Sequence, residues 1–133
     1  MRILKFGSVG VLNTLVDYAV FNALVLGAGM SVAPANVISY STGIANSWFW
    51  NKRWTFADRP MRYPRLALPT FIAVNLVGLV LNTGAVLSLQ ALGVRMGVPE
   101  MMSEAVYLNI YKTLAITVSY AWNYLATKHI VFR

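Results

Sequence analysis

This sequence of 133 residues has no cysteine, one histidine and few charged residues. The absence of cysteine excludes disulfides, a thiol nucleophile and a thiolate metal site, and His129 alone cannot assemble a zinc site. Only 11% of the residues are charged, whereas an ordinary soluble domain has about a quarter. Apolar residues make up 58%. These proportions exclude an ordinary soluble domain and indicate a single membrane domain over 1–133.

Four apolar segments have about the 20 residues that a helix needs to cross a bilayer. They cover 6–26, 33–50, 70–92 and 106–126. We therefore predict an all-α integral membrane protein with four transmembrane helices. A cleaved signal peptide fits the first segment poorly, because the run is long and contains Asn13 and Asp17.

The sequence also repeats itself. Leu12-Asn13-Thr14 returns as Leu81-Asn82-Thr83, a period of roughly 70 residues. Each copy is followed by a second apolar run with a basic and aromatic end, so the fold is expected to consist of two repeated helical hairpins. Such halves often place a binding site between them. The predicted parts are repeat one over 1–56, a basic loop over 51–69 and repeat two over 70–133.

The basic residues indicate the orientation. Of the 11 Lys and Arg residues, all except Arg95 and Lys112 lie before the first span, between the second and third, or after the fourth. By the positive-inside rule, both termini of this multi-pass protein are then cytoplasmic. The net charge of +7 also favours contact with anionic lipids of the cell (plasma or inner) membrane. Nucleic acid is not an expected partner, since the basic residues lie close to the membrane surface.

The second span is the least apolar, and its start and packing face can both be predicted. Ser31 is suited to cap the helix, and Pro34 fits in its first turn. Small residues at intervals of four form one stripe along the helix, and such a stripe allows close backbone contact in lipid. This stripe consists of Ala35, Ser39, Gly43 and Ser47.

Two charged residues fall inside the predicted spans. Asp17 lies about 16 Å along the first span, near the bilayer midplane, and Lys112 lies within about 5 Å of the same depth. In the repeat, Asp17 corresponds to Val86 and Lys112 to Asn36, so each half carries one charge. Because an isolated charge at this depth is costly, three interpretations are open. They are a structural ion pair, an ion pair that opens to accept a ligand's charge, and a protonated Asp17 without a partner.

Asparagines occur in all four spans, on the side predicted to be cytoplasmic. Together they predict a polar chamber, with basic residues at its entrance. Amides and cations at such an entrance suit a phosphate group carried on a lipid. The nearby tryptophans fit either an interfacial belt or the walls of that entrance. The candidate binding residues are Asn13, Asn46, Asn51, Lys52, Arg53, Asn82, Asn123 and Lys128.

No motif for hydrolysis or group transfer is visible. The sequence has no paired-carboxylate motif, no Ser-His-Asp set and no Gly-rich phosphate loop. We therefore expect neither an enzyme nor a bound cofactor or metal.

A family resemblance runs through the whole chain. In the first half it rests on Phe6-Gly7-Ser8-Val9-Gly10, Asn13-Thr14, Asp17-Tyr18, Ala35-Asn36, Ser39, Asn46 and Asn51-Lys52-Arg53-Trp54-Thr55-Phe56. In the second half it rests on Asn82, Lys112, Trp122-Asn123 and 128–132. As a set, these motifs resemble the GtrA-like family of small four-span membrane proteins. Ser47 and the segment 127–130 depart from the family pattern, so we do not expect equal use of the two halves.

The resemblance implies a role in cell-surface polysaccharide synthesis. Members are proposed to flip polyisoprenyl-phosphate-linked sugars, and a related module is the membrane domain of some dolichyl-phosphate-mannose synthases. Our leading hypothesis is therefore translocation of such a lipid, with Lys52, Arg53 and Lys128 holding the phosphate and the Asp17–Lys112 pair controlling passage. The alternatives are a non-transporting anchor or partner of a glycosyltransferase, and a small multidrug exporter. Since a lipid-linked head group is bulky, we also expect a homodimer.

Overall fold

The computed structural model describes residues 2–55 and 64–126. In these two ranges all regular secondary structure is helical, which confirms the all-α prediction. Four long helices are present, and a four-residue helix lies between the last two. Their bounds are Arg2–Asn22 (α1), Val32–Trp50 (α2), Pro64–Arg95 (α3), Val98–Met101 (α4) and Glu104–Ala126 (α5).

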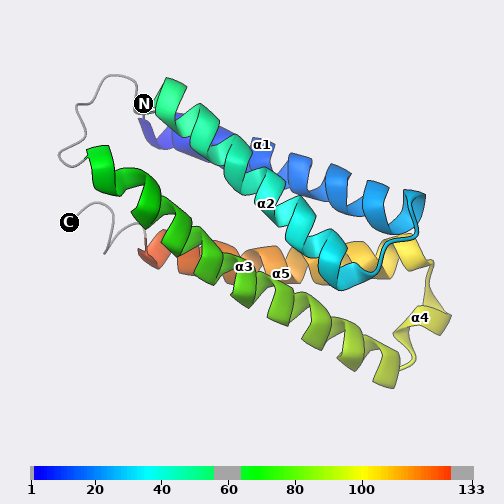
Figure 1. Cartoon of the computed structure of the whole chain (residues 1–133). Coiled ribbons are helices and arrows are strands. Elements are labelled where there is room, and N and C mark those ends of the chain that lie inside the picture. Colours follow the sequence, from blue (N-terminus) through cyan, green and yellow to red (C-terminus); the bar gives the residue numbers. More distant parts are fainter. Residues whose placement is uncertain (1, 56–63, 127–133) are drawn as a thin grey trace.

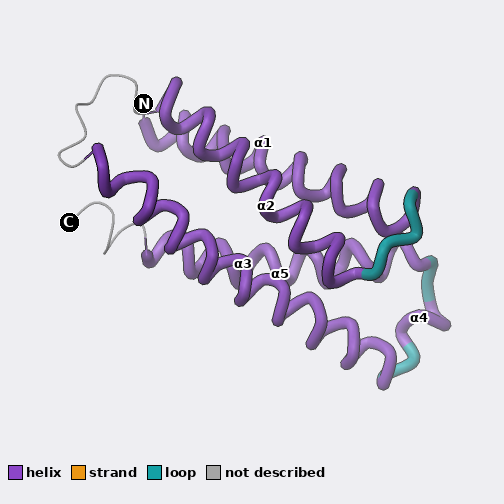
Figure 2. The backbone as a smooth tube through the Cα atoms, in the orientation of Figure 1, coloured by secondary structure: helices purple, strands orange, loops and turns teal. Residues whose placement is uncertain are grey.

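The four long helices form two pairs that lie side by side (Figure 1). The α1–α2 pair and the α3–α5 pair each have closely approaching backbones along their length. The beginnings of α1 and α3 and the ends of α2 and α5 lie together at one end of the bundle. We call this the basic end, because Lys5, Lys52, Arg53 and Arg65 belong to it. The opposite end, with α4 and the short connections in Figure 2, is called the loop end.

At the loop end, glycines and one π-helical turn allow the chain to reverse. Helix α1 continues as a π-helical turn over Ala23–Gly27, in which the amide of Ala28 donates to the carbonyl of Ala23 at 3.0 Å. Gly29 and Gly97 then have φ values of 67° and 71°, a region that favours glycine. Ser31 stands at the N-cap position of α2, but its side chain makes no capping hydrogen bond. Its carbonyl accepts from Ala35 instead, so the predicted side-chain cap is wrong.

The predicted basic loop over 51–69 is longer than the connection that the structure has. A π-helical turn over Asn51–Thr55 extends α2, and α3 already begins at Pro64. Proline is well tolerated at the first position of a helix, where its missing N–H has no intrahelical partner. Pro69 lies inside α3, a position that membrane helices tolerate better than soluble ones. Residues 56–63 lie outside the described ranges.

Two segments, Gly7–Gly27 and Leu68–Arg95, are long and apolar enough to cross a membrane. Only 22% of each apolar stretch is buried inside the protein. A core helix of a soluble protein would be mostly buried, so these exposed apolar faces are those expected against lipid. Helices α2 and α5 have comparable lengths of 19 and 23 residues. They carry more of the polar residues described below, and their crossing of the membrane stays a prediction.

The small-residue stripe of α2 faces the interior, as predicted. Ala35, Ser39 and Gly43 are buried, and Ser47 is half-buried. A Cβ atom placed on Gly43 would lie 3.7 Å from the carbonyl oxygen of Asn13 in α1. The two backbones therefore approach closely at this point, which leaves little room for a larger side chain.

Candidate functional site

The two intramembrane charges meet. The ammonium Nζ of Lys112 in α5 lies 2.9 Å from Oδ1 of Asp17 in α1. Lys112 is 0% exposed and Asp17 is 6% exposed. The pair therefore joins the α1–α2 pair of helices to the α3–α5 pair, away from water.

Helix α2 supplies the remaining polar partners of Lys112. Its ammonium donates to Oδ1 of Asn36 at 2.5 Å and to Oγ of Ser39 at 3.1 Å. The ion pair with Asp17 is the third polar contact of the ammonium. The ring of Phe21 lies 4.6 Å from the ammonium, a distance suited to a cation–π contact. The positive charge is thus compensated inside the protein, as burial requires.

Asn36 extends this arrangement to α3, the remaining long helix. Its amide Nδ2 donates to Oδ1 of Asn82 and to Oγ1 of Thr83, each at 3.0 Å. Asn82 in turn donates to Ser119 at 3.3 Å. A hydrogen-bonded network therefore connects all four long helices, and we call it the central network: Asp17, Asn36, Ser39, Asn82, Thr83, Lys112 and Ser119.

Asp17 belongs to the central network through its ion pair with Lys112. Its Oδ1 atom is buried and makes no hydrogen bond to any residue within 2–55 or 64–126, although it lies close to the ammonium. A carboxylate has about four lone-pair sites for donors. The carboxylate therefore has capacity for further donors, and an anion with more oxygen atoms can contact the ammonium of Lys112 in the same way.

Toward the loop end, two further bridges join α1 to α5. The hydroxyl groups of Tyr18 and Thr113 form a short hydrogen bond. The amides of Asn22 and Asn109 bond to each other in both directions, at 2.9 and 2.8 Å. We call these four residues the α1–α5 seam. They continue the contact between α1 and α5 from the ion pair toward the loop end.

At the basic end, cations lie over aromatic rings. Lys52 is 6.0 Å from the ring centroid of Trp48 and Arg53 is 4.4 Å from that of Phe49. Lys5 of α1 lies 5.5 Å from the ring of Trp54. Lys52 and Arg53 are exposed, so their charged groups are accessible to an anion while the rings fix their position.

The predicted binding residues do not form one chamber. Asn82 belongs to the central network, but Asn13 accepts from Asn46 at 2.7 Å within the α1–α2 pair, and Trp50 donates to Asn46. Asn123 donates to Tyr40 at 3.4 Å. Counting along the sequence predicts the same side of the membrane for all four asparagines, but it does not give the rotation of each helix, and rotation decides which amides meet.

A glycine makes the Asn123 contact possible. A Cβ atom on Gly78 of α3 would lie 2.5 Å from the hydroxyl oxygen of Tyr40 and 3.0 Å from Oδ1 of Asn123. Any larger residue would displace these side chains. The Oδ1 atom of Asn123 is buried and without a hydrogen-bond partner among the described residues.

Asn51 and Lys128 are two further residues of the predicted binding site. Asn51 is 7% exposed and donates to Ser47 at 3.0 Å, so it lies inside the bundle, apart from the exposed Lys52 and Arg53. Lys128 lies outside the described residues. Of the basic residues predicted at the entrance, the structure describes Lys52 and Arg53, and it places Lys5 at the same end of the bundle.

Several contact residues were not predicted for the site: Asn36, Ser39, Ser119, Phe21, Tyr40, Lys5 and the four residues of the α1–α5 seam. The sequence contains patterns that could have indicated some of these residues. Asn36 is the repeat counterpart of Lys112, and the structure brings these two side chains together. In α5, polar residues recur at 109, 112, 119 and 123, intervals that place them on one helix face. The cation–aromatic contact of Lys5 has no comparable signal in the sequence.

The comparison with protein families gives one match over nearly the whole chain. Residues 5–132 match the family described as "GtrA/DPMS, transmembrane domain". No solved structure matches the chain.

Curated relatives match shorter parts. The chain is 48% identical over 52 residues to the uncharacterized membrane protein YngA of Bacillus subtilis (strain 168), covering 39% of the chain and 34% of the relative. It is 39% identical over 61 residues to the bactoprenol-linked glucose translocase of Shigella phage SfII, covering 44% and 51%. A prophage bactoprenol-linked glucose translocase homolog of Escherichia coli (strain K12) is 29% identical over 99 residues, covering 55% and 82%. The chain thus spans about half the length, or less, of the first two.

Proposed function

Because this chain belongs to the GtrA/DPMS transmembrane-domain family, we propose that it binds a polyisoprenyl-phosphate-linked sugar and moves it across the membrane. This step would serve cell-surface polysaccharide or glycolipid synthesis. The names of the phage and prophage relatives support a lipid-linked substrate. The observation that carries the proposal is the buried Asp17–Lys112 pair within a network of amides and hydroxyls.

The first step is capture of the phosphate at the basic end. Lys5, Lys52 and Arg53 lie there over aromatic rings, which suits the interface between head groups and hydrocarbon. By the positive-inside rule, this end faces the cytoplasm, so both termini are cytoplasmic in the proposed four-span topology. The bilayer's anionic lipids compete for the same cations, each worth about 1 kcal/mol. Affinity for the substrate must therefore come from additional contacts deeper in the bundle.

The second step is exchange at the central network. A phosphate carries several charged oxygen atoms, whereas Asp17 presents to Lys112 one oxygen atom, 2.9 Å from the ammonium. The phosphate therefore replaces Asp17 at the ammonium. The amides of Asn36 and Asn82 then exchange their mutual bond for bonds to sugar hydroxyl groups. Opening of the α1–α5 seam completes a path to the other side.

The competing functions predict different behaviour. A small multidrug exporter needs a carboxylate for its cationic substrate, but Asp17 is already engaged by Lys112, so a cation would have to displace an ammonium. A non-transporting partner of a glycosyltransferase needs no exchange at the ion pair. Binding of a glycosyltransferase and formation of a homodimer remain predictions alongside translocation.

A liposome assay tests the proposal. The chain is reconstituted with a fluorescent polyisoprenyl-phosphate-linked sugar, and a membrane-impermeant quencher measures how much lipid changes leaflet. We expect fast exchange with the unmodified chain. The double variant Asp17→Asn, Lys112→Gln should stay folded but lose translocation, because neutral amides do not attract the phosphate.

Arg95→Gln serves as the control, since it removes one positive charge from the last residue of α3, whose end lies at the loop end (Figure 1). It should exchange lipid at the unmodified rate. If the unmodified chain binds the lipid without moving it between leaflets, translocation is wrong and the anchoring function takes its place. If it does not bind the lipid, the proposed substrate is wrong.

A further inference from the structure

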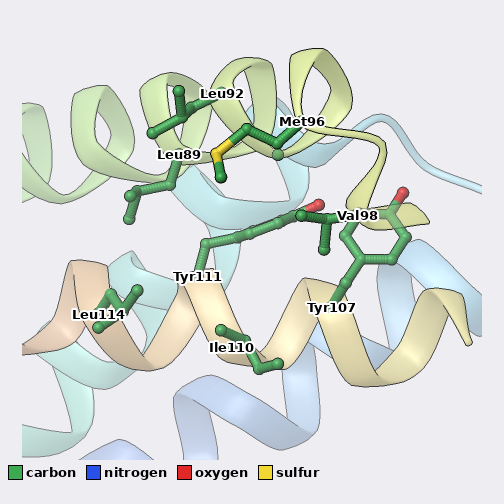
Figure 3. A pocket seen from close by; sticks show the side chains of 9 residues that line it. Leu89, Leu92, Met96, Val98, Tyr107, Ile110, Tyr111 and Leu114 are labelled. Carbon is green, nitrogen blue, oxygen red and sulfur yellow. The ribbon is translucent and has the colours of Figure 1, made fainter. Parts of the chain in front are cut away.

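A pocket lies between α3, α4 and α5 at the loop end (Figure 3). Its volume is about 140 Å³. The lining is almost entirely hydrocarbon, and six of the residues that form it are Leu89, Leu92, Met96, Tyr107, Tyr111 and Leu114. Leu92, Met96 and Leu114 are about half exposed or more, so the pocket opens on the outer surface of the bundle.

The pocket has the properties of a small hydrocarbon site. An enclosed apolar cavity of about 150 Å³ holds a six-carbon ring in a well-studied case, and this pocket has a similar volume but is open on one side. A water molecule needs two to four polar partners there, and the hydroxyl of Tyr111 is itself buried and unbonded among the described residues. The pocket therefore fits about five or six carbon atoms and offers water little.

We propose that this pocket binds one branched isoprene unit of a polyisoprenyl chain. The inference rests on the proposed function and adds a site for the lipid tail. Tyr107 and Tyr111 form an edge-to-face pair with centroids 5.2 Å apart, which gives the pocket aromatic walls against which methyl groups and a double bond pack well. A straight acyl chain lacks the side methyl group and the double bond that pack against these rings.

The position of the pocket relates a bound lipid tail to the charge of Lys112. Tyr111 directly precedes Lys112, and successive residues of a helix are about 100° apart around its axis. One turn of α5 thus presents Lys112 to the polar interior and Tyr111 to the pocket. This division of faces matches a lipid whose phosphate travels inside the bundle while its chain stays outside. Tyr111 and Leu114 of the lining flank Lys112 along α5, and the pocket extends from there toward the loop end.

Gly93 provides the test, because its missing side chain leaves the pocket open. A Cβ atom there would lie 3.7 Å from the Tyr111 ring and 3.8 Å from Cβ of Val98, which are ordinary contact distances. Gly93→Ala should therefore fold, and Gly93→Leu should fill the pocket. Gly84→Leu is the matched control, since a Cβ atom on Gly84 of the same helix meets nothing within 4 Å.

The full chain is titrated with farnesyl phosphate and with dodecyl phosphate, a saturated straight-chain probe, in the same detergent. Because detergent is as apolar as the pocket, affinity comes from close packing. Loss of about ten carbon contacts predicts roughly tenfold weaker farnesyl phosphate binding for Gly93→Leu, with a smaller loss for Gly93→Ala and none for Gly84→Leu. Tyr111→Phe keeps the aromatic wall and removes only the hydroxyl group, so it reports whether the occupant makes a polar contact there.

Other results overturn the inference in distinguishable ways. If Gly93→Leu and Gly84→Leu bind farnesyl phosphate with equal affinity, the pocket does not bind the lipid tail, and the proposed function is unaffected. Equal losses for both probes in Gly93→Leu make it a general acyl-chain site. A large loss in Tyr111→Phe means that the occupant is polar. Failure of the unmodified chain to bind farnesyl phosphate contradicts the inference together with the proposed substrate.

Discussion

Contacts within the helix pairs differ in kind from contacts between them. Within the α1–α2 pair, backbones approach closely at small residues such as Gly43. Between the pairs, much of the contact consists of polar side chains, including Asp17–Lys112, Asn36–Asn82 and the α1–α5 seam. A small apolar cluster with Phe21 and Leu108 also crosses between the pairs. Polar bridges are therefore concentrated where the two pairs meet.

This difference indicates where the protein opens. Close backbone packing depends on shape, and separating two such helices loses all of their van der Waals contacts together. Polar bonds can be exchanged one by one for bonds to a ligand's phosphate and hydroxyl groups, so their loss is compensated. We therefore expect each pair to move as a unit and the boundary between the pairs to open during transport.

The largest expected effect comes from closing that boundary permanently. The sequence has no cysteine, so Asn22→Cys with Asn109→Cys introduces the only two thiols, and a short bis-thiosulfonate reagent can join them. Translocation in liposomes should fall to background and return on reduction, because the α1–α5 seam can no longer separate. Each single-cysteine variant treated with the same reagent should remain active. Unchanged transport after complete cross-linking would show that the seam does not open.

The next largest effect concerns the ion pair. Asp17→Asn or Lys112→Met alone leaves one buried group without its partner and should lower the free energy of unfolding by roughly 3–5 kcal/mol. The double variant Asp17→Asn, Lys112→Met should lose clearly less free energy of unfolding than the sum of the two single losses, since the two residues are in contact. Unfolding in mixed micelles measures this coupling. Additive losses would mean that the pair does not hold the two helix pairs together.

A smaller effect is expected from packing within a pair. Gly43→Val places methyl groups against the backbone of α1 and should cost about 1–3 kcal/mol of unfolding free energy. Gly84→Val faces open space and should change stability by less than about 0.5 kcal/mol. The same micelle unfolding measurement compares them. Similar values for both variants would argue against shape-dependent packing within the α1–α2 pair.

Part of the site could be predicted because depth in a membrane is a one-dimensional property of the sequence. Counting residues along two spans placed Asp17 and Lys112 at similar depth, and the structure brings their charges within 2.9 Å. The same counting placed four asparagines on one side, but Asn13 and Asn46 bond within one pair while Asn82 lies in the central network. Equal depth is necessary for contact and does not ensure it.

The sequence by itself determined the class of protein, the positions of the four long helices and the residues too costly to leave alone in lipid. Apolar composition and helix length specify these properties locally. Only the tertiary structure decided how each helix is rotated, and therefore that Asn36 and Ser39 complete the contacts of Lys112. The tertiary structure also decided that a pocket lies beside Tyr111, between α3, α4 and α5. Rotation results from the packing of all helices at once, so no single segment of sequence contains it.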